Sequence, residues 1–221
     1  MASSTIENYL KAILLRSGEP GGMVPTGTIA EALGVVPGTS TTMVKSMAKQ
    51  GLVEYHARTG VRLTAKGRTL ALAVLRKHRL IESFLVQVLK MDWSEVHEEA
   101  EALEHAISDH VLARLDEFLG HPVVDPHGDP IPNVKHPRFE TKGGVTLANC
   151  APAKSWRVVR ILDQTSRFLE FVQQTGLKPG ARVRVMKRDR TSGVVHCDLR
   201  AGGTTALGFA EASKIEVAEA S

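Results

Sequence analysis

The stretch from residue 26 to residue 63 constrains the fold most, because it places four short elements in an order that few folds share. Residues 26–33 have a helical pattern, Gly34 marks a turn, and a second helical pattern follows Pro37 and continues to Gln50. Directly afterwards, residues 52–55 and 61–63 have strand patterns on either side of the turn HARTG. A helix, a tight turn, a second helix and a β-hairpin predict a winged helix-turn-helix domain.

Three longer helices are expected around this core. Residues 5–16 place apolar side chains at helical spacing and are followed by the glycine-rich run GEPGG. Thr64 is a suitable N-cap for a long helix that ends before Asp92. A third helix is expected over residues 94–119, because a serine opens it and Gly120 closes it. The N-terminal half is therefore predicted to be mainly helical.

The second helix of the helix-turn-helix has a polar side that fits duplex DNA. Val44, Met47 and Ala48 are expected to face the core, which leaves short hydroxyls and two lysines outside. Hydroxyls at the start of such a helix can meet phosphates or base edges, and lysines can contact the DNA backbone. The candidate DNA-binding residues are Thr39, Ser40, Thr41, Thr42, Lys45 and Lys49, with Arg58 and Arg62 in the wing.

Charge is distributed unevenly along the chain. Residues 1–78 hold 10 Lys and Arg against 4 acids, residues 79–130 hold 3 against 12, and residues 131–221 hold 15 against 8. The net charges of +6, −9 and +7 give the +4 of the whole chain. A basic N-terminal part fits a polyanion, and an acidic middle part that contains histidines fits a bound cation.

The acidic part carries candidate metal ligands on two helices. His97, Glu101, Glu104 and His105 lie at positions i, i+4, i+7 and i+8, so they share one helical face beside the apolar side. On the preceding helix, His78 and Glu82 are also four residues apart. Carboxylates and imidazoles without thiolates favour manganese, iron or zinc. The alternative is a solvated acidic face with no ion, and His110, His121, His127 and His136 are expected on the surface or in a linker.

Composition excludes several classes of protein. Cys150 and Cys197 are far apart and lack CxxC spacing, which argues against a disulfide framework or a thiolate zinc site. No signal peptide and no long apolar run is recognised, so a cytoplasmic protein without a membrane partner is expected. The 5% aromatic content, without interleaved basic residues, argues against single-stranded nucleic acid.

Four regions are expected along the chain. They are a winged helix-turn-helix domain (1–72), a helical dimerisation and metal-binding domain (73–125), a linker (126–153) and a C-terminal domain (154–221). The linker is inferred from its proline, glycine and charged residues. Residues 155–162, 181–188, 193–199 and 213–217 have strand patterns around one short helix near residues 167–175, which predicts a small SH3-like β-barrel. The fold class is mainly α with β.

Several stretches resemble the diphtheria-toxin-repressor family. They are ENYLKAI, GTSTTMVKSMAKQGLVEY, RLTAKGR, RKHRLIESFL and VHEEAEALEHAISD followed by HGDPIPN. The resemblance covers nearly the whole chain and implies a metal-dependent repressor that binds operator DNA as a homodimer, with a C-terminal domain that is SH3-like (FeoA-like). It implies no enzymatic activity and no small organic substrate.

The resemblance also implies ligand sets. Glu101, Glu104 and His105 match the primary ligands, completed by Asn8, and the ancillary ligands implied are His78, Glu82 and His97. Glutamate at position 101 matches the manganese branch, so Mn²⁺ is expected first and Fe²⁺ second, with Zn²⁺ or Co²⁺ possible in vitro. The manganese branch usually has aspartate at position 8 and glutamate at position 11, and Asn8 and Lys11 depart from that pattern. Asp163, Gln164 and Glu170 lie near where C-terminal ligands are expected.

Other classes of function remain open from the sequence. One is a winged-helix regulator whose acidic cluster is structural and which does not respond to metal. A second is a metalloenzyme with Glu101 or Glu104 as its base, although no nucleophile arrangement, phosphate loop or HExxH motif accompanies these residues. A third is a metal carrier, against which the basic wing argues.

Overall fold

The computed structural model describes residues 3–18, 21–133, 144–199 and 203–220. The prediction for His136 and the part of the predicted linker at residues 134–143 therefore lie outside the described residues. Among the described residues, no helix combines the length and the apolar character that a membrane crossing requires.

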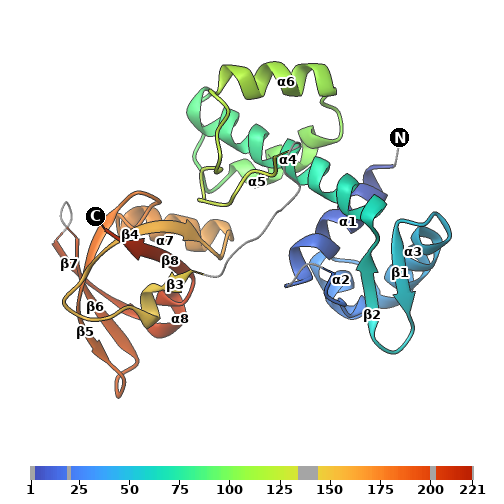
Figure 1. Cartoon of the computed structure of the whole chain (residues 1–221). Helices are drawn as coiled ribbons and strands as arrows, with labels where there is room; N and C mark the ends of the chain where they lie inside the picture. Colours follow the sequence, from blue (N-terminus) through green and yellow to red (C-terminus); the bar gives the residue numbers. More distant parts are fainter. Residues whose placement is uncertain (1–2, 19–20, 134–143, 200–202, 221) are drawn as a thin grey trace. The chain divides into compact units, whose positions relative to one another are not determined.

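The first part of the chain has the predicted helix-turn-helix and wing (Figure 1). Its elements are α1 (Ser4–Arg16), α2 (Thr26–Ala32), α3 (Pro37–Lys49), β1 (Val53–His56) and β2 (Gly60–Leu63). The two strands pair antiparallel from Val53 with Leu63 to His56 with Gly60. Leu10 and Ile13 of α1 pack in one core with Val44 and Met47 of α3. Helix α1 is therefore part of the winged domain.

The long helix α4 (Ala65–Gln87) begins where the sequence predicts. The hydroxyl of Thr64 accepts a hydrogen bond from the backbone N–H of Gly67 at 3.1 Å, which is an N-cap contact. A Cβ at position 67 would lie 1.9 Å from the carbonyl oxygen of Leu52. Glycine is therefore required there, because the first turn of α4 packs directly on the chain that enters the wing.

The single helix expected over residues 94–119 is wrong. The chain forms two helices, α5 (Val96–Glu104) and α6 (Asp109–Phe118). Between them, the hydroxyl of Ser108 accepts a hydrogen bond from Val111 N–H at 3.3 Å, so Ser108 starts a new helix. The periodic apolar pattern continues across the break, which is why periodicity did not reveal it. The break places His105 just beyond the end of α5.

The C-terminal part forms a six-stranded antiparallel sheet in the order β3-β8-β4-β5-β6-β7. Its elements are β3 (Val145–Thr146), β4 (Ser155–Ile161), α7 (Ser166–Gln174), β5 (Arg182–Asp189), β6 (Val194–Leu199), β7 (Gly203–Gly208), α8 (Phe209–Ala212) and β8 (Ile215–Glu219), with a 3-10 turn over Leu147–Asn149. The predicted strands are all present, and β3, β7 and α8 were not predicted. The fold class is confirmed.

Two compact units divide the chain, and the division runs within helices α4, α5 and α6. The first comprises residues 1–79, 102–112 and 131–140, and the second comprises residues 80–101, 113–130 and 141–221. Within the second unit, the indole of Trp93 belongs to the core of the C-terminal sheet. The backbone N–H of Ile161 donates to the carbonyl oxygen of His127 at 2.9 Å. Residues 125–130 therefore pack against strand β4.

Candidate metal centres

The buried carboxylate of Glu104 is surrounded by cationic and imidazole groups of the first unit. Its two oxygens lie 2.7 and 2.8 Å from the Nζ atom of Lys11, which is on α1. Its Oε2 also lies 2.7 Å from Nδ1 of His78, which is on α4. The Glu104 side chain is fully buried, and the Lys11 and His78 side chains are nearly so. Helices α1, α4 and α5 thus meet at one carboxylate.

The charge state of Glu104 follows from these contacts. Burial alone would raise the pKa of this carboxyl, because it disfavours the charged form. The hydrogen bond with His78 and the charge of Lys11 act in the opposite direction and hold the pKa of Glu104 below its ordinary value. The side chain is therefore an ionised carboxylate at neutral pH, which is the form that binds metal.

His105 connects the end of α5 to α1. Its Nδ1 lies 2.6 Å from Oε2 of Glu7, and its Nε2 lies 2.8 Å from Oδ1 of Asn8 and 3.4 Å from Oε1 of Glu104. When Nδ1 donates to Glu7, Nε2 and the Asn8 oxygen both present lone pairs to each other. Two such atoms repel at this distance unless a proton or a metal ion lies between them. Glu7 was not predicted, and it orients the imidazole as a partner behind a metal ligand does.

Glu101 lies one turn before Glu104 on α5. The ligand atoms that Glu101, Glu104 and His105 can offer all lie within 4.8 Å of one another. Together with Asn8, these residues are the predicted primary ligands, and we call them the first centre. Their oxygen and nitrogen atoms, without sulfur, suit a manganese or iron(II) ion.

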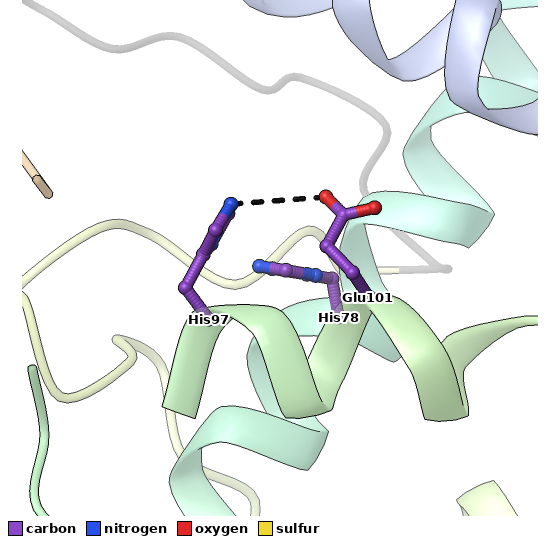
Figure 2. A group of neighbouring side chains, drawn as sticks. All are labelled: His78, His97 and Glu101. Atoms are coloured by element: carbon purple, nitrogen blue, oxygen red, sulfur yellow. Dashed lines mark ion pairs between the residues drawn. The ribbon is translucent and has the colours of Figure 1, made fainter. Parts of the chain in front are cut away.

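His97 contacts two carboxylates. Its Nε2 lies 3.8 Å from Oε1 of Glu101 one turn later on α5, and Figure 2 shows this ion pair, with His78 as the third labelled side chain. Its Nδ1 lies 3.4 Å from Oε1 of Glu82 on α4. The ring is about half exposed, whereas Glu82 is buried. Of the predicted ancillary residues, Glu82 and His97 are therefore adjacent, and His78 contacts Glu104. His78 and His97 can also offer ligand atoms within 4.8 Å of one another and of Glu101.

A further group of candidate ligands was not predicted from the sequence. Glu82, Asp125 and His127 are all buried and can offer ligand atoms within 4.8 Å of one another, and we call them the second centre. The Nε2 of His127 lies 2.9 Å from the carbonyl oxygen of Trp93, so it must donate its proton there. In the neutral ring, Nδ1 then carries a lone pair, and this buried atom has no hydrogen-bond partner among the described residues. It faces Glu82 Oε2 at 3.9 Å, as a ligand would face a shared ion.

The expectation of a surface or linker position for His127 is wrong, because this side chain is fully buried. Proline and glycine around it suggested a loose connection. Instead, the Asp125 carboxylate accepts hydrogen bonds from the backbone N–H groups of His127 and Asp129, at 2.8 and 2.9 Å. The resulting tight turn holds the histidine inward. His110 and His121 are exposed, as expected.

The expected C-terminal ligands have other partners. Asp163 forms an ion pair with Lys214 at 2.8 Å, and Gln164 donates to Asp129 at 2.5 Å. Glu170 is exposed on α7. Among the described residues, neither Asp163 nor Glu170 belongs to a group of histidines, cysteines or carboxylates with metal-ligand spacing.

The surface of α3 shows most of the expected DNA-binding side chains. Thr39, Thr42, Lys45 and Lys49 are exposed, and Thr41 is partly buried. The expectation of an exposed Ser40 is wrong, because Ser40 is fully buried and its hydroxyl donates to the carbonyl oxygen of Thr26 at 3.2 Å. This contact ties α3 to α2 and fixes the angle of the helix-turn-helix.

The wing carries its two predicted arginines on the outside. Arg58 is exposed in the turn between β1 and β2. Arg62 is also exposed and forms an ion pair with Glu54, with an Nη2 to Oε2 distance of 2.6 Å. Arg58 is thus in the turn, and Arg62 is oriented across the hairpin by its acidic neighbour.

Comparison with known proteins identifies the family. Residues 1–61 match a family model described as iron dependent repressor, N-terminal DNA binding domain, and residues 64–133 match iron dependent repressor, metal binding and dimerisation domain. Residues 145–219 match a FeoA domain. The iron-dependent repressor IdeR of Mycobacterium tuberculosis is 35% identical over 193 residues, which are 82% of this chain and 83% of that protein. The diphtheria toxin repressor of Corynebacterium efficiens is 31% identical, with 87% of each chain covered.

Solved structures agree with this assignment. A manganese-dependent transcriptional repressor in complex with manganese superimposes with a TM-score of 0.87 at 38% identity, covering 97% of this chain and all of that chain. The manganese regulator SloR gives a TM-score of 0.78 at 33% identity, with 97% and 98% coverage. These relatives are named as repressors or regulators, and none of the names describes an enzyme. The chain belongs to the diphtheria-toxin-repressor family of metal-dependent transcriptional repressors.

Proposed function

We propose that this protein is a manganese-responsive repressor that binds two-fold symmetric operator DNA as a homodimer in the cytoplasm and controls genes of metal-ion homeostasis. The observation that carries the choice of manganese is the first centre, in which every candidate ligand atom is oxygen or nitrogen. The two cysteines, which a softer metal would favour, are buried in the core of the C-terminal sheet. Iron(II) is the second candidate, because curated relatives are named as iron-dependent repressors.

The residues that would hold the principal ion are Asn8, Glu101, Glu104 and His105. A bound divalent ion supplies the positive charge that lets carboxylates and a neutral imidazole converge. Glu7 holds the proton of His105 at Nδ1 and so leaves Nε2 for the ion. Asn8 carries the connection to α1, which packs in the core of the winged domain.

For an ancillary ion, the contacts favour the second centre. The sequence predicts His78, Glu82 and His97 as ancillary ligands, but the contacts divide them between two groups with metal-ligand spacing. His78 and His97 lie with Glu101 in one group, and Glu82 lies with Asp125 and His127 in the other. We propose instead that Glu82, Asp125 and His127 form this site, with His97 beside Glu82. The buried lone pair of His127 supports this assignment.

Dimerisation is proposed to use α6 and its surroundings. No side chain of α6 is buried, although its sequence alternates apolar and polar residues at helical spacing. Val111 is 53% exposed and Phe118 is 69% exposed. Val123, shortly after α6, is 77% exposed. Apolar side chains that gather in this way on a surface mark an interface, and a second copy of the chain is the partner that the dimerisation-domain match indicates.

In the dimer, the two α3 helices would enter successive major grooves, about 34 Å apart. Thr39 and Thr42 are proposed to meet phosphates or base edges at the start of α3, and Lys45 and Lys49 to contact the backbone. Arg58 and Arg62 would contact neighbouring phosphates. Holding the winged domain in one position through Asn8 would raise DNA affinity about 5- to 150-fold, the usual range for a coupling of roughly 1–3 kcal/mol.

The test is DNA binding followed by fluorescence anisotropy with the upstream region of the gene. Binding is measured in chelated buffer and after addition of Mn²⁺, anaerobic Fe²⁺, Zn²⁺ or Co²⁺. We expect the strongest stimulation by Mn²⁺ and its loss in Glu104→Ala. Glu219→Ala is the matched control, because Glu219 is an exposed glutamate on β8, outside the candidate metal, DNA and dimer surfaces. If no metal changes the DNA affinity, a regulator with a purely structural acidic cluster is favoured. If Fe²⁺ gives the strongest stimulation, the protein is an iron-responsive repressor instead of a manganese-responsive one.

A further inference from the structure

The Nζ atom of Lys11 occupies a position that is unusual for a lysine. It lies between both oxygens of Glu104, at 2.7 and 2.8 Å, and 3.5 Å from Nδ1 of His78. Lys11 is only 6% exposed, although lysine is among the residues least often buried. The ammonium therefore lies among groups that are themselves potential metal ligands.

We propose that the ammonium of Lys11 is a built-in cation that takes the place of a second metal ion beside the first centre and limits that centre to one divalent ion. This inference rests on the proposed metal response. It adds that residue 11 determines how many ions this centre holds.

Geometry supports this role. A carboxylate that bridges two metal ions gives one oxygen to each, with the ions about 3.5–4 Å apart. Here Glu104 Oε1 lies on the side of His105, and Oε2 lies on the side of His78, at 3.4 and 2.7 Å from the ring nitrogens. The side of His105 carries the ligands of the first centre. The Nζ atom of Lys11 contacts both oxygens, and it also lies 3.5 Å from Nδ1 of His78. The ammonium therefore occupies the side of His78, where a second divalent ion would be in direct conflict with it.

Charge supports the same conclusion. An ion bound on the side of His78 would meet a positive charge held in place by two short hydrogen bonds. Repulsion between like charges is strong where water is excluded, and Glu104 is fully buried. No carboxylate is contributed by α1 at this position, because residue 11 is a lysine. The same ion pair also joins α1 to α5 without metal.

The substitution that tests this proposal is Lys11→Glu, which removes the ammonium and adds a carboxylate. The intact protein is loaded with Mn²⁺ and studied by electron paramagnetic resonance, in which two ions bridged by a carboxylate show exchange coupling and isolated ions do not. We expect uncoupled ions in the wild type. In Lys11→Glu we expect a coupled pair and one additional Mn²⁺ per protomer in equilibrium dialysis. The surface substitution Lys66→Glu makes the same charge change outside the centre and should leave both results unchanged.

Ions in the second centre do not change the interpretation of the exchange coupling. The two proposed ligand sets share no residue, so an ion in the second centre contributes only an uncoupled signal. A coupled pair in the wild type would overturn the proposal, since it would mean that metal displaces Lys11. A folded Lys11→Glu protein that gains no ion would overturn it as well. A wild type that binds no Mn²⁺ would instead contradict the proposed function itself.

A second measurement observes the ammonium in the wild type and does not need Lys11→Glu, and a second variant, Lys11→Gln, serves only to assign the signal. Buried ammonium groups that exchange slowly with water give separate NMR signals, and the signal of Lys11 is assigned by its absence in Lys11→Gln. We expect this signal to persist, with a small shift, when diamagnetic Zn²⁺ fills the first centre. Its disappearance upon metal addition would show that the ammonium leaves, and would overturn the proposal.

Discussion

The imidazole of His127 stacks on the indole of Trp93, with ring centroids 5.4 Å apart, and donates its Nε2 proton to the carbonyl oxygen of the same tryptophan. One residue thus fixes both the plane and the tautomer of the histidine. Because the tautomer is fixed, the lone pair on Nδ1 is directed at Glu82 before any ion arrives. The second centre is therefore organised in advance by its own protein contacts.

His127→Phe should abolish metal binding at the second centre and retain the aromatic stacking. The ring keeps its shape but loses the ligand nitrogen. Equilibrium dialysis with Mn²⁺ should show one ion fewer per protomer than in the wild type. His121→Phe, which changes an exposed histidine, should bind as the wild type does. Unchanged stoichiometry in His127→Phe would show that His127 is not a ligand.

Lys45→Ala should weaken binding to all DNA sequences to a similar extent. Because a dimer carries two copies of Lys45, two phosphate contacts are lost, and the slope of log affinity against log salt concentration should decrease by about 2. The check is a salt titration of anisotropy on operator and random DNA. Lys154→Ala on the C-terminal sheet is the control, since Lys154 is paired with Glu219. A selective loss on the operator alone would mean that Lys45 reads bases.

Phe118→Asp should shift the protein from dimer to monomer. Burying an exposed phenylalanine in an interface contributes about 1.5–3 kcal/mol, and a two-fold symmetric dimer buries two of them, so the dimer dissociation constant should rise roughly 10²- to 10⁴-fold. Sedimentation at several concentrations measures this change. Glu117→Gln on the same helix should have little effect. A Phe118→Asp protein that remains a tight dimer would place the interface elsewhere.

Gly128→Ala should lower the thermal stability of the second unit much more than Gly180→Ala does. The two glycines have φ values of +90° and +93°, so both substitutions introduce similar backbone strain. A Cβ at position 128 would also lie 2.0 Å from the carbonyl oxygen of Val159, whereas position 180 is open. The difference in melting temperature therefore measures the packing of residues 125–130 on β4. Equal losses would show that this packing contributes little.

Neither cysteine should react with thiol reagents in the native protein at pH 8. Burial raises the pKa of Cys150 to about 12 and that of Cys197 to about 11, so neither forms thiolate at this pH. In the unfolded chain both thiols ionise near pH 9, so alkaline pH above that value should favour unfolding. Counting reactive thiols with and without denaturant checks this, and fast native labelling would contradict it.

Local patterns in the sequence predict most elements of this fold but not the contacts between distant segments. Thr64 marks the start of α4, and the glycine at position 34 marks the turn before α3. The break between α5 and α6 was missed because Ser108 acts as an N-cap inside a continuous apolar period. Strand β7, with the sequence GTTALG, was missed because it has few large apolar residues.

The same difference separates the candidate ligands that the sequence predicts from those that it does not. Spacing on one helix brings Glu101, Glu104 and His105 together, and a sequence can show spacing. His127 is different, because a turn made by the Asp125 carboxylate carries it inward after a stretch that resembles a linker. Glu7 likewise approaches His105 only through tertiary packing. Its position beside Asn8 on α1 was the one available signal.

Helix α1 has 13 residues and is therefore a rod of about 20 Å. On one side, Leu10 and Ile13 are fully buried in the winged domain, and on another, Asn8 and Lys11 contact His105 and Glu104. Because the helix is rigid, it cannot tilt toward His105 and Glu104 without also moving the core residues of the winged domain that are packed on its other side. Any displacement at the carboxylate is thus converted into rotation of the whole helix-turn-helix, and no flexible hinge inside α1 is needed to relay it.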